Sequence, residues 1–269
     1  MSAAGIGLLG WLFTRFGLPG LLIGGAVLYF MSGGLGGGSD SASIDPSQQP
    51  AVASDPAEDE AVQFVSFVLD DVQKTWTDEF AKNNQRYPLA RLVLFRGRTQ
   101  SGCGTGSAMS GPFYCPTDQR VYIDLSFYDE LRQRFGAPGD FAQAYVIAHE
   151  IGHHVQHLLG LTERVHNAAR GDRQGEDSAS VRLELQADCL AGVWARSTDQ
   201  RKLLEEGDIQ EALTAAAAIG DDRLQKQSTG TVSPESWTHG SSEQRMRWFK
   251  RGFTEGSLQR CDTFAADVL

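Results

Sequence analysis

The sequence has no excess of basic residues. Its 269 residues include 24 lysines and arginines against 34 aspartates and glutamates, which gives a formal net charge of −10. Proteins that bind nucleic acid through its phosphates need a surplus of cations, because binding releases counterions from the polyanion. The charge balance therefore predicts that nucleic acid is not a partner. Hydrophobic residues make up 41% and charged residues 22%, which excludes a wholly disordered chain and allows one large domain or two small ones.

Charge of either sign is also absent between Phe16 and Ser39. Within this stretch Leu18–Met31 is densely apolar, and about 20 uncharged residues suffice for a helix that crosses a bilayer. We predict that residues 1–36 form a single-pass anchor in the cell membrane. Arg15 precedes the apolar stretch and places the N-terminus in the cytoplasm, with the rest of the chain periplasmic or extracellular. A cleaved signal peptide and a buried helix are the alternatives.

Residues 37–58 lack apolar periodicity and contain three prolines among many serines, aspartates and alanines. This composition is typical of a flexible linker, because it cannot bury enough apolar surface to offset the entropy of ordering. The folded domain is therefore expected to span residues 59–269.

Cysteines are few, and no C-x-x-C occurs, which argues against a zinc site made of cysteines. All four follow the linker, and an even number in an exported domain favours disulfides. Cys103 and Cys115 flank a glycine-rich loop, so we predict that they pair locally, and a Cys189–Cys261 bond then follows by exclusion. Four buried free thiols are the alternative.

Hydrophobic periodicity predicts an α+β fold that is mostly helical with a small sheet. Apolar residues between Val62 and Phe80 recur every three or four positions, the period of an amphipathic helix. Two β-rich stretches, Arg91–Phe95 and Gln119–Leu125, lie on either side of the glycine-rich loop. Further helices are expected after a Ser126–Asp129 capping box as far as Gly136, over 176–198, and after a Ser241–Gln244 box. Asp140 and Asp208 are expected to cap two more, which end at about Leu159 and at Gly220.

A short motif within the helix predicted to start at Asp140 points to metal chemistry. The chain has six histidines, and two of them form His149-Glu150-Ile151-Gly152-His153, an H-E-x-x-H. Residues four apart share one face of a helix, so both imidazoles can bind one cation, while Glu150 lies about 100° further round and reaches the metal's water as general base. The alternative is a set of solvated polar residues on a helix without metal. The apolar neighbours of the motif favour the metal, which gives buried imidazoles a partner.

A zinc ion held by two histidines needs a further protein ligand for a catalytic site. The candidates are His154, His157, His166, Glu184 and Asp188. Glu184 and Asp188 lie four residues apart on another apolar helix, so one carboxylate can bind the metal while the other accepts the spare N–H of a ligand imidazole. The longer Glu184 suits the metal and Asp188 the imidazole. Swapped roles and a merely solvated pair remain as alternatives.

Four segments of the sequence resemble those of a known protein family. The segments HEIGHHVQHLLG, ELQADCLAGVWA, SGCGTG…GPFYCPTDQRVYID and THGSSEQR, spread over residues 60–265, are similar to the bacterial neutral zinc metallopeptidase family. The resemblance implies a zincin-like domain behind an N-terminal membrane segment. It also implies that His149, His153 and Glu184 are zinc ligands and that Glu150 is the catalytic base.

The segment around His239 is similar to a stretch of the CAAX prenyl endopeptidase group, except that Gly240 stands where that group has proline. This likeness implies that His239 is catalytic, stabilising the oxyanion, and that Arg245 braces its loop; a surface histidine is the alternative. By analogy with zincins, Arg120–Asp124 is expected to be an edge strand that pairs with extended substrate. The Cys103–Cys115 loop forms either the upper wall of the cleft or merely a stapled hairpin.

Together these inferences predict a membrane-anchored endopeptidase that cleaves a peptide or protein substrate, with Zn2+ as cofactor and Glu150 as general base. One alternative is a zinc-binding interaction protein on the same scaffold with weak catalysis. Another is a hydrolase of non-peptide amides or esters, because H-E-x-x-H indicates water activation and not the acyl group attacked. The sequence leaves the natural substrate and the oligomeric state open.

Overall fold

A computed structural model describes residues 56–107, 111–167 and 170–269, which belong to a compact unit, Ser54–Leu269. The predicted membrane segment, residues 1–36, and most of the predicted linker lie outside the described residues. Residues 56–58, assigned to the linker above, instead open the first described helix. Within the described ranges, no helix is both long enough and apolar enough to span a bilayer.

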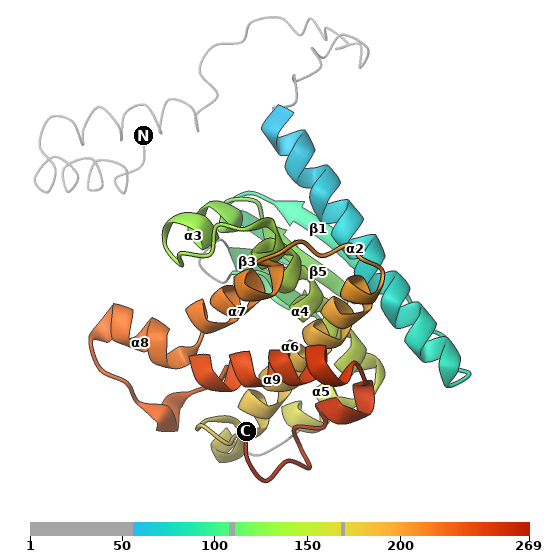
Figure 1. Cartoon of the computed structure of the whole chain (residues 1–269). Coiled ribbons are helices and arrows are strands. Elements are labelled where there is room, and N and C mark those ends of the chain that lie inside the picture. Colours follow the sequence, from blue (N-terminus) through green and yellow to red (C-terminus); the bar gives the residue numbers. More distant parts are fainter. Residues whose placement is uncertain (1–55, 108–110, 168–169) are drawn as a thin grey trace, which may run out of the picture. The chain divides into compact units, whose positions relative to one another are not determined.

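Helices dominate the described residues, and the strands are short (Figure 1). The helices are α2 (Pro56–Lys82), α3 (Phe127–Gln133), α4 (Asp140–Leu158), α5 (Leu161–His166), α6 (Ala179–Gln200), α7 (Asp208–Ala218), α8 (Asp221–Thr229) and α9 (Ser242–Glu255). The strands are β1 (Arg91–Phe95), β2 (Arg98–Ser101), β3 (Gly104–Ser107), β4 (Phe113–Cys115) and β5 (Arg120–Asp124). The predicted α+β class is confirmed, as are both predicted strands, whereas β2, β3, β4, α5 and α8 were not predicted.

β5 lies at the centre of a three-stranded sheet with the order β1–β5–β4. It pairs in parallel with β1, where Leu92 is opposite Val121, and antiparallel with β4, where Tyr114 is opposite Val121. The expectation that Arg120–Asp124 is an edge strand is therefore wrong, because both of its edges are already paired. β1 and β4 are the edge strands of this sheet, and β2 with β3 forms a separate antiparallel hairpin.

The core is built from one stripe of α2 and from helices that are buried almost all round. The stripe of α2 consists of Val65, Val68, Val72, Trp76 and Phe80, each at most 5% exposed. α4 and α6 are buried over most of their length, as their apolar sequences predict. Burial of this apolar surface is the main stabilising contribution to the fold, and it fixes α4 and α6 inside the molecule.

Helices α4, α6 and α9 approach one another closely at three glycines, and at two of them no side chain fits. A Cβ atom on Gly152 of α4 would lie 3.1 Å from the backbone of Ala187 in α6. A Cβ on Gly252 of α9 would lie 1.9 Å from the carbonyl oxygen of Cys189 in α6, and one on Gly192 of α6 would lie 2.2 Å from the backbone of α9. The three helices therefore pack backbone against backbone, with α6 in the middle.

Two capping boxes were predicted, and one of them forms. Ser241 and Gln244 make the complete reciprocal box at the start of α9. Ser126 precedes α3 as expected but makes no capping bond. Its backbone is helical and not extended as in a capping residue, and its hydroxyl donates to Asp124 Oδ1 at 2.6 Å.

The predicted aspartate caps of α4 and α7 are also wrong, because Asp140 and Asp208 lie inside their helices and glycines occupy the capping positions. The free N–H groups of α4 are satisfied from another helix. Glu211 of α7 accepts the backbone N–H of Phe141 at 3.1 Å. A cap from a residue 70 positions away has no local sequence signature.

Both predicted disulfides are present. Cys103 pairs with Cys115 across the glycine-rich loop, and Cys189 of α6 pairs with Cys261, which follows α9. None of the four is a free thiol. The second bond closes a stretch of 72 residues and ties the chain beyond α9 to the centre of α6.

Gly252→Ala is expected to lower the free energy of unfolding by about 1–3 kcal/mol, the usual cost of overpacking. The new methyl would collide with the carbonyl oxygen of Cys189, which is backbone and cannot rotate away. Urea unfolding followed by circular dichroism measures the change. Gly152→Ala serves for comparison. It is expected to lower the free energy of unfolding less, because its Cβ would lie 3.1 Å from the nearest atom of α6 and not 1.9 Å. A Gly252→Ala protein as stable as wild type would contradict the close packing of α6 and α9.

Candidate metal centre

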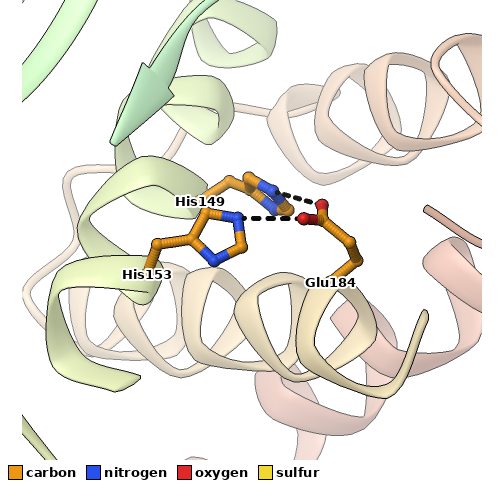
Figure 2. A group of neighbouring side chains, drawn as sticks. All are labelled: His149, His153 and Glu184. Carbon is orange, nitrogen blue, oxygen red and sulfur yellow. Dashed lines mark hydrogen bonds and ion pairs between the residues drawn. The ribbon is translucent and has the colours of Figure 1, made fainter. Parts of the chain in front are cut away.

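Three side chains from α4 and α6 converge on one point, and we call them the His–His–Glu cluster: His149, His153 and Glu184 (Figure 2). The Nε2 atom of His149 lies 3.2 Å from Glu184 Oε2, and the Nε2 atom of His153 lies 3.3 Å from Glu184 Oε1. Donor atoms of the three residues lie within 4.8 Å of one another. The helical spacing brings the imidazoles together, and the close contact of α4 with α6 at Gly152 brings the carboxylate to them.

His149 is buried, His153 and Glu184 are partly buried, and the carboxylate faces both imidazoles. Burial raises the pKa of the Glu184 carboxyl, but the facing imidazoles of His153 and His149 outweigh burial, so this pKa lies well below its ordinary value. Burial lowers the pKa of His149, yet Asp188 beside it outweighs burial and raises that pKa to about 9. The site thus keeps Glu184 ionised, and a cation bound between this carboxylate and the two imidazoles would replace the protons that they otherwise hold.

Asp188 fixes the orientation of the first imidazole. It is fully buried, and its Oδ1 accepts the Nδ1–H of His149 at 2.9 Å, which leaves the Nε2 lone pair of His149 for a metal. The same carboxylate pairs with Arg245, whose Nε lies 2.9 Å from Oδ2, and accepts the hydroxyl of Tyr145. Arg245 was expected to brace the loop of His239. Its guanidinium instead forms an ion pair with Asp188 and neutralises this buried anion.

Gln156 holds the second imidazole, and the sequence analysis missed it. Its Oε1 lies 2.8 Å from the Nδ1 of His153, so the Nε2 of that ring is again free for a metal. The signal that could have identified Gln156 is its position three residues after His153 on the same face of an otherwise apolar helix. Both imidazoles therefore present Nε2 to Glu184 and are held at Nδ1.

The other histidines considered as ligands lie elsewhere. His154 is fully buried, with its Nδ1 2.9 Å from the Tyr114 hydroxyl and its Nε2 2.7 Å from the Pro88 carbonyl oxygen, so it links α4 to the strands. His157 pairs with Glu163. His166 ends α5 and is not part of the cluster.

A cavity of about 800 Å3 opens beside the cluster. Glu150 lies in its wall, 7% exposed, next to the two histidines. Burial raises the pKa of the Glu150 carboxyl above its ordinary value, although His153 and His149 act in the opposite direction. A carboxylate with a raised pKa beside a metal is suited to take up and release a proton.

The remaining cavity wall combines β4 with apolar helix residues. Residues 111–114 and Pro116 contribute one side, so part of the Cys103–Cys115 loop does form a wall of the cleft. Further apolar side chains in the wall come from α3 and the residues after it, from α4 and from the α7–α8 region: Phe127, Phe135, Val146, Ile219 and Leu224.

His239 also lines this cavity, with half of its side chain exposed. Asp221 at the start of α8 holds its loop: one carboxylate oxygen accepts the backbone N–H groups of Thr238, His239 and Gly240, and the other lies 3.2 Å from the Nδ1 of His239. The hydrogen bond from Asp221 raises the pKa of His239, although burial opposes it. Gly240 has a φ of +90°, which proline cannot adopt, so the loop differs in backbone from the H-P stretch it resembles.

Two imidazoles on α4 and a glutamate on α6, beside a large cavity, form the donor set of a mononuclear zinc site. The family model described as "Putative neutral zinc metallopeptidase" matches residues 4–264, and the chain belongs to this family. This confirms the family resemblance derived from the motifs, while the ligand roles of the cluster stay a prediction.

Relatives in several bacteria are similar over most of the chain. "Uncharacterized protein YpfJ" of Escherichia coli K12 is 54% identical over 222 residues, which cover 82% of this chain and 77% of that protein. "Uncharacterized protein Mb2605" of Mycobacterium bovis and "Uncharacterized protein Rv2575" of Mycobacterium tuberculosis H37Rv are each 49% identical over 191 residues, 67% of this chain and 64% of theirs. No solved structure matches the chain.

Glu184→Ala is expected to abolish equimolar zinc binding, because it removes the ligand from α6 and leaves two imidazoles without a carboxylate. Elemental analysis after zinc loading and gel filtration measures the content. Asp208→Ala is the matched control, since Asp140, Asp208 and Glu211 form another group whose donor atoms lie within 4.8 Å of one another. Zinc lost from Asp208→Ala and kept by Glu184→Ala would contradict the assignment of the site.

Proposed function

We propose that this protein is a membrane-anchored zinc endopeptidase. The observation that carries the proposal is the convergence of His149, His153 and Glu184 beside Glu150 in the wall of a large cavity. Membership of a zinc metallopeptidase family supports the same reaction class. The three cluster residues would hold the ion, and their neutral Nε2 atoms and single carboxylate suit Zn2+.

Glu150 carries the proton in the proposed reaction. When bound, zinc supplies polarisation of the scissile carbonyl and acidifies the attacking water. Glu150 takes the proton of that water and then gives it to the leaving amine, so a single carboxyl serves as base and as acid. Its burial at 7% exposure and its raised pKa support this exchange.

His239 is proposed to stabilise the oxyanion. Asp221 and Thr238 occupy its Nδ1, and the bond to Asp221 raises the pKa of the ring, so in the protonated ring Nε2 carries an N–H that can donate to a group in the cavity. A donor held in this way needs no reorganisation when negative charge develops on the substrate.

An extended peptide fits the walls of the cavity. β4 is an edge strand and contributes Phe113 and Tyr114 to the wall, so its free edge can pair with a substrate backbone. The apolar residues of the wall, with Phe127, Phe135 and Leu224 among them, favour a large apolar side chain next to the cleaved bond.

The proposed location is the outer side of the cell membrane. The apolar segment within residues 1–36 would anchor the chain, with the catalytic domain periplasmic or extracellular. The two disulfides support this compartment, because such bonds persist in oxidising surroundings and are rare in the cytosol.

Glu150→Gln is expected to keep zinc and fold but to lower peptide hydrolysis by about two to four orders of magnitude. The amide retains the size of the side chain and cannot exchange a proton. Digests of a peptide library by wild type and variant, each checked for zinc content, measure the effect. Cleavage retained by Glu150→Gln would exclude this mechanism, and two equally blank digests would favour the zinc-binding protein with weak catalysis.

His239→Ala is expected to lower kcat by about 100- to 1000-fold with little change in KM, because the donor acts on charge that exists only in the transition state. Steady-state kinetics with one cleaved peptide separates the two constants. His166→Ala removes an imidazole outside the cluster and serves as control. If the kcat of His239→Ala were close to that of wild type, His239 would be a surface histidine without a part in catalysis.

A further inference from the structure

Two buried glutamines connect His153 to the backbone on the far side of α6. Gln156 Oε1 lies 2.8 Å from the Nδ1 of His153, and its Nε2 donates to the Leu183 carbonyl oxygen at 2.7 Å and to Gln186 Oε1 at 3.0 Å. Gln186 Nε2 in turn donates to the carbonyl oxygen of Cys261 at 3.0 Å. We call this series of bonds the glutamine relay.

The two carbonyl oxygens at its ends fix the direction of the whole relay. A backbone carbonyl only accepts, so the amide group facing Leu183 and the one facing Cys261 must each be the NH2. The Oε1 of Gln186 then faces Gln156, and the Oε1 of Gln156 faces His153. Both amides are buried, with Gln156 0% and Gln186 6% exposed, so a flipped amide would leave acceptors facing acceptors without water to separate them.

The direction of the relay decides which nitrogen of His153 carries the proton. Gln156 Oε1 can only accept, so His153 Nδ1 must be the donor, and the lone pair of the neutral ring lies on Nε2. Nε2 is the atom that faces Glu184, at 3.3 Å from Oε1. A carboxylate could not replace the amide of Gln156, because it would have no N–H for Leu183 or Gln186.

We propose that Gln156 is the positioning residue that holds His153 in its metal-binding tautomer, and that Gln186 fixes Gln156 from the Cys261 carbonyl. The proposal rests on the metal site assigned above. It gives the chain beyond α9 a part in metal binding, because the Cys189–Cys261 disulfide holds Cys261 against α6. The cluster is thus supported by a carboxylate at His149 and by a neutral amide at His153.

Gln156→Met tests the proposal, since methionine fills a similar volume without accepting or donating. The dissociation constant for zinc, measured by competition with a chromophoric chelator, is expected to rise about 10- to 100-fold, as for other residues that orient a ligand imidazole. Gln73→Met is the matched control, because Gln73 is also buried, 5% exposed, but lies on α2. Gln186→Met is expected to weaken zinc binding less than Gln156→Met and more than Gln73→Met.

Thermal melting of the metal-free proteins separates positioning from mere cross-linking of α4 and α6. A Gln156→Met protein with a lowered Tm but a wild-type zinc dissociation constant would overturn the proposal. If Gln156→Met does not fold, Gln186→Met decides: a dissociation constant equal to that of Gln73→Met overturns the relay, and a higher one supports it. Wild type that binds no zinc would refute the metal site itself, which is a different outcome from equal binding by wild type and variants.

Discussion

Backbone contact between α4 and α6 is the constraint on which the site depends. The H-E-x-x-H motif places two imidazoles on one face of α4, but it cannot supply the carboxylate. Gly152, inside the motif, lets α6 approach until a Cβ there would lie 3.1 Å from Ala187, and Glu184 is one helical turn before Ala187. A larger side chain at position 152 would push the two helices apart and with them the donors of the cluster.

α9 has a comparable role on the other side of α6. It delivers Arg245 to the buried carboxylate of Asp188, and its approach requires glycine at 252 and at 192. Without that guanidinium, Asp188 would be an anion in the interior with only the imidazole of His149 and the hydroxyl of Tyr145 for support, a costly arrangement. Packing and charge compensation therefore depend on the same helix. α9 packs against α6 and also supplies Arg245, which neutralises the Asp188 carboxylate that orients His149.

The sequence predicted what depends on short-range geometry. The pairing of His149 with His153, the apolar helix that carries Glu184, and the capping box of α9 all follow from helical periodicity. The α4 cap failed because Glu211 supplies it from α7, and β4 was missed because a strand of three residues within a glycine-rich loop has no periodic pattern. Gln156 was missed for a related reason: its partners Leu183 and Gln186 are on another helix, so its importance appears only in three dimensions.

The loop of His239 keeps the histidine of the H-P stretch that it resembles but differs from it in backbone conformation. The histidine of the resembled H-P stretch has a counterpart at the cavity wall, yet the residue after it cannot be proline, because φ is +90° at Gly240 and a Cβ there would press on Val181 and Leu185. Rigidity that a proline ring would give must come from elsewhere. Asp221 provides it by accepting three consecutive backbone N–H groups of this loop as well as bonding to the imidazole. A histidine can therefore reach the cavity wall from a loop without proline, provided that a buried carboxylate such as Asp221 restrains the loop backbone in place of the proline ring.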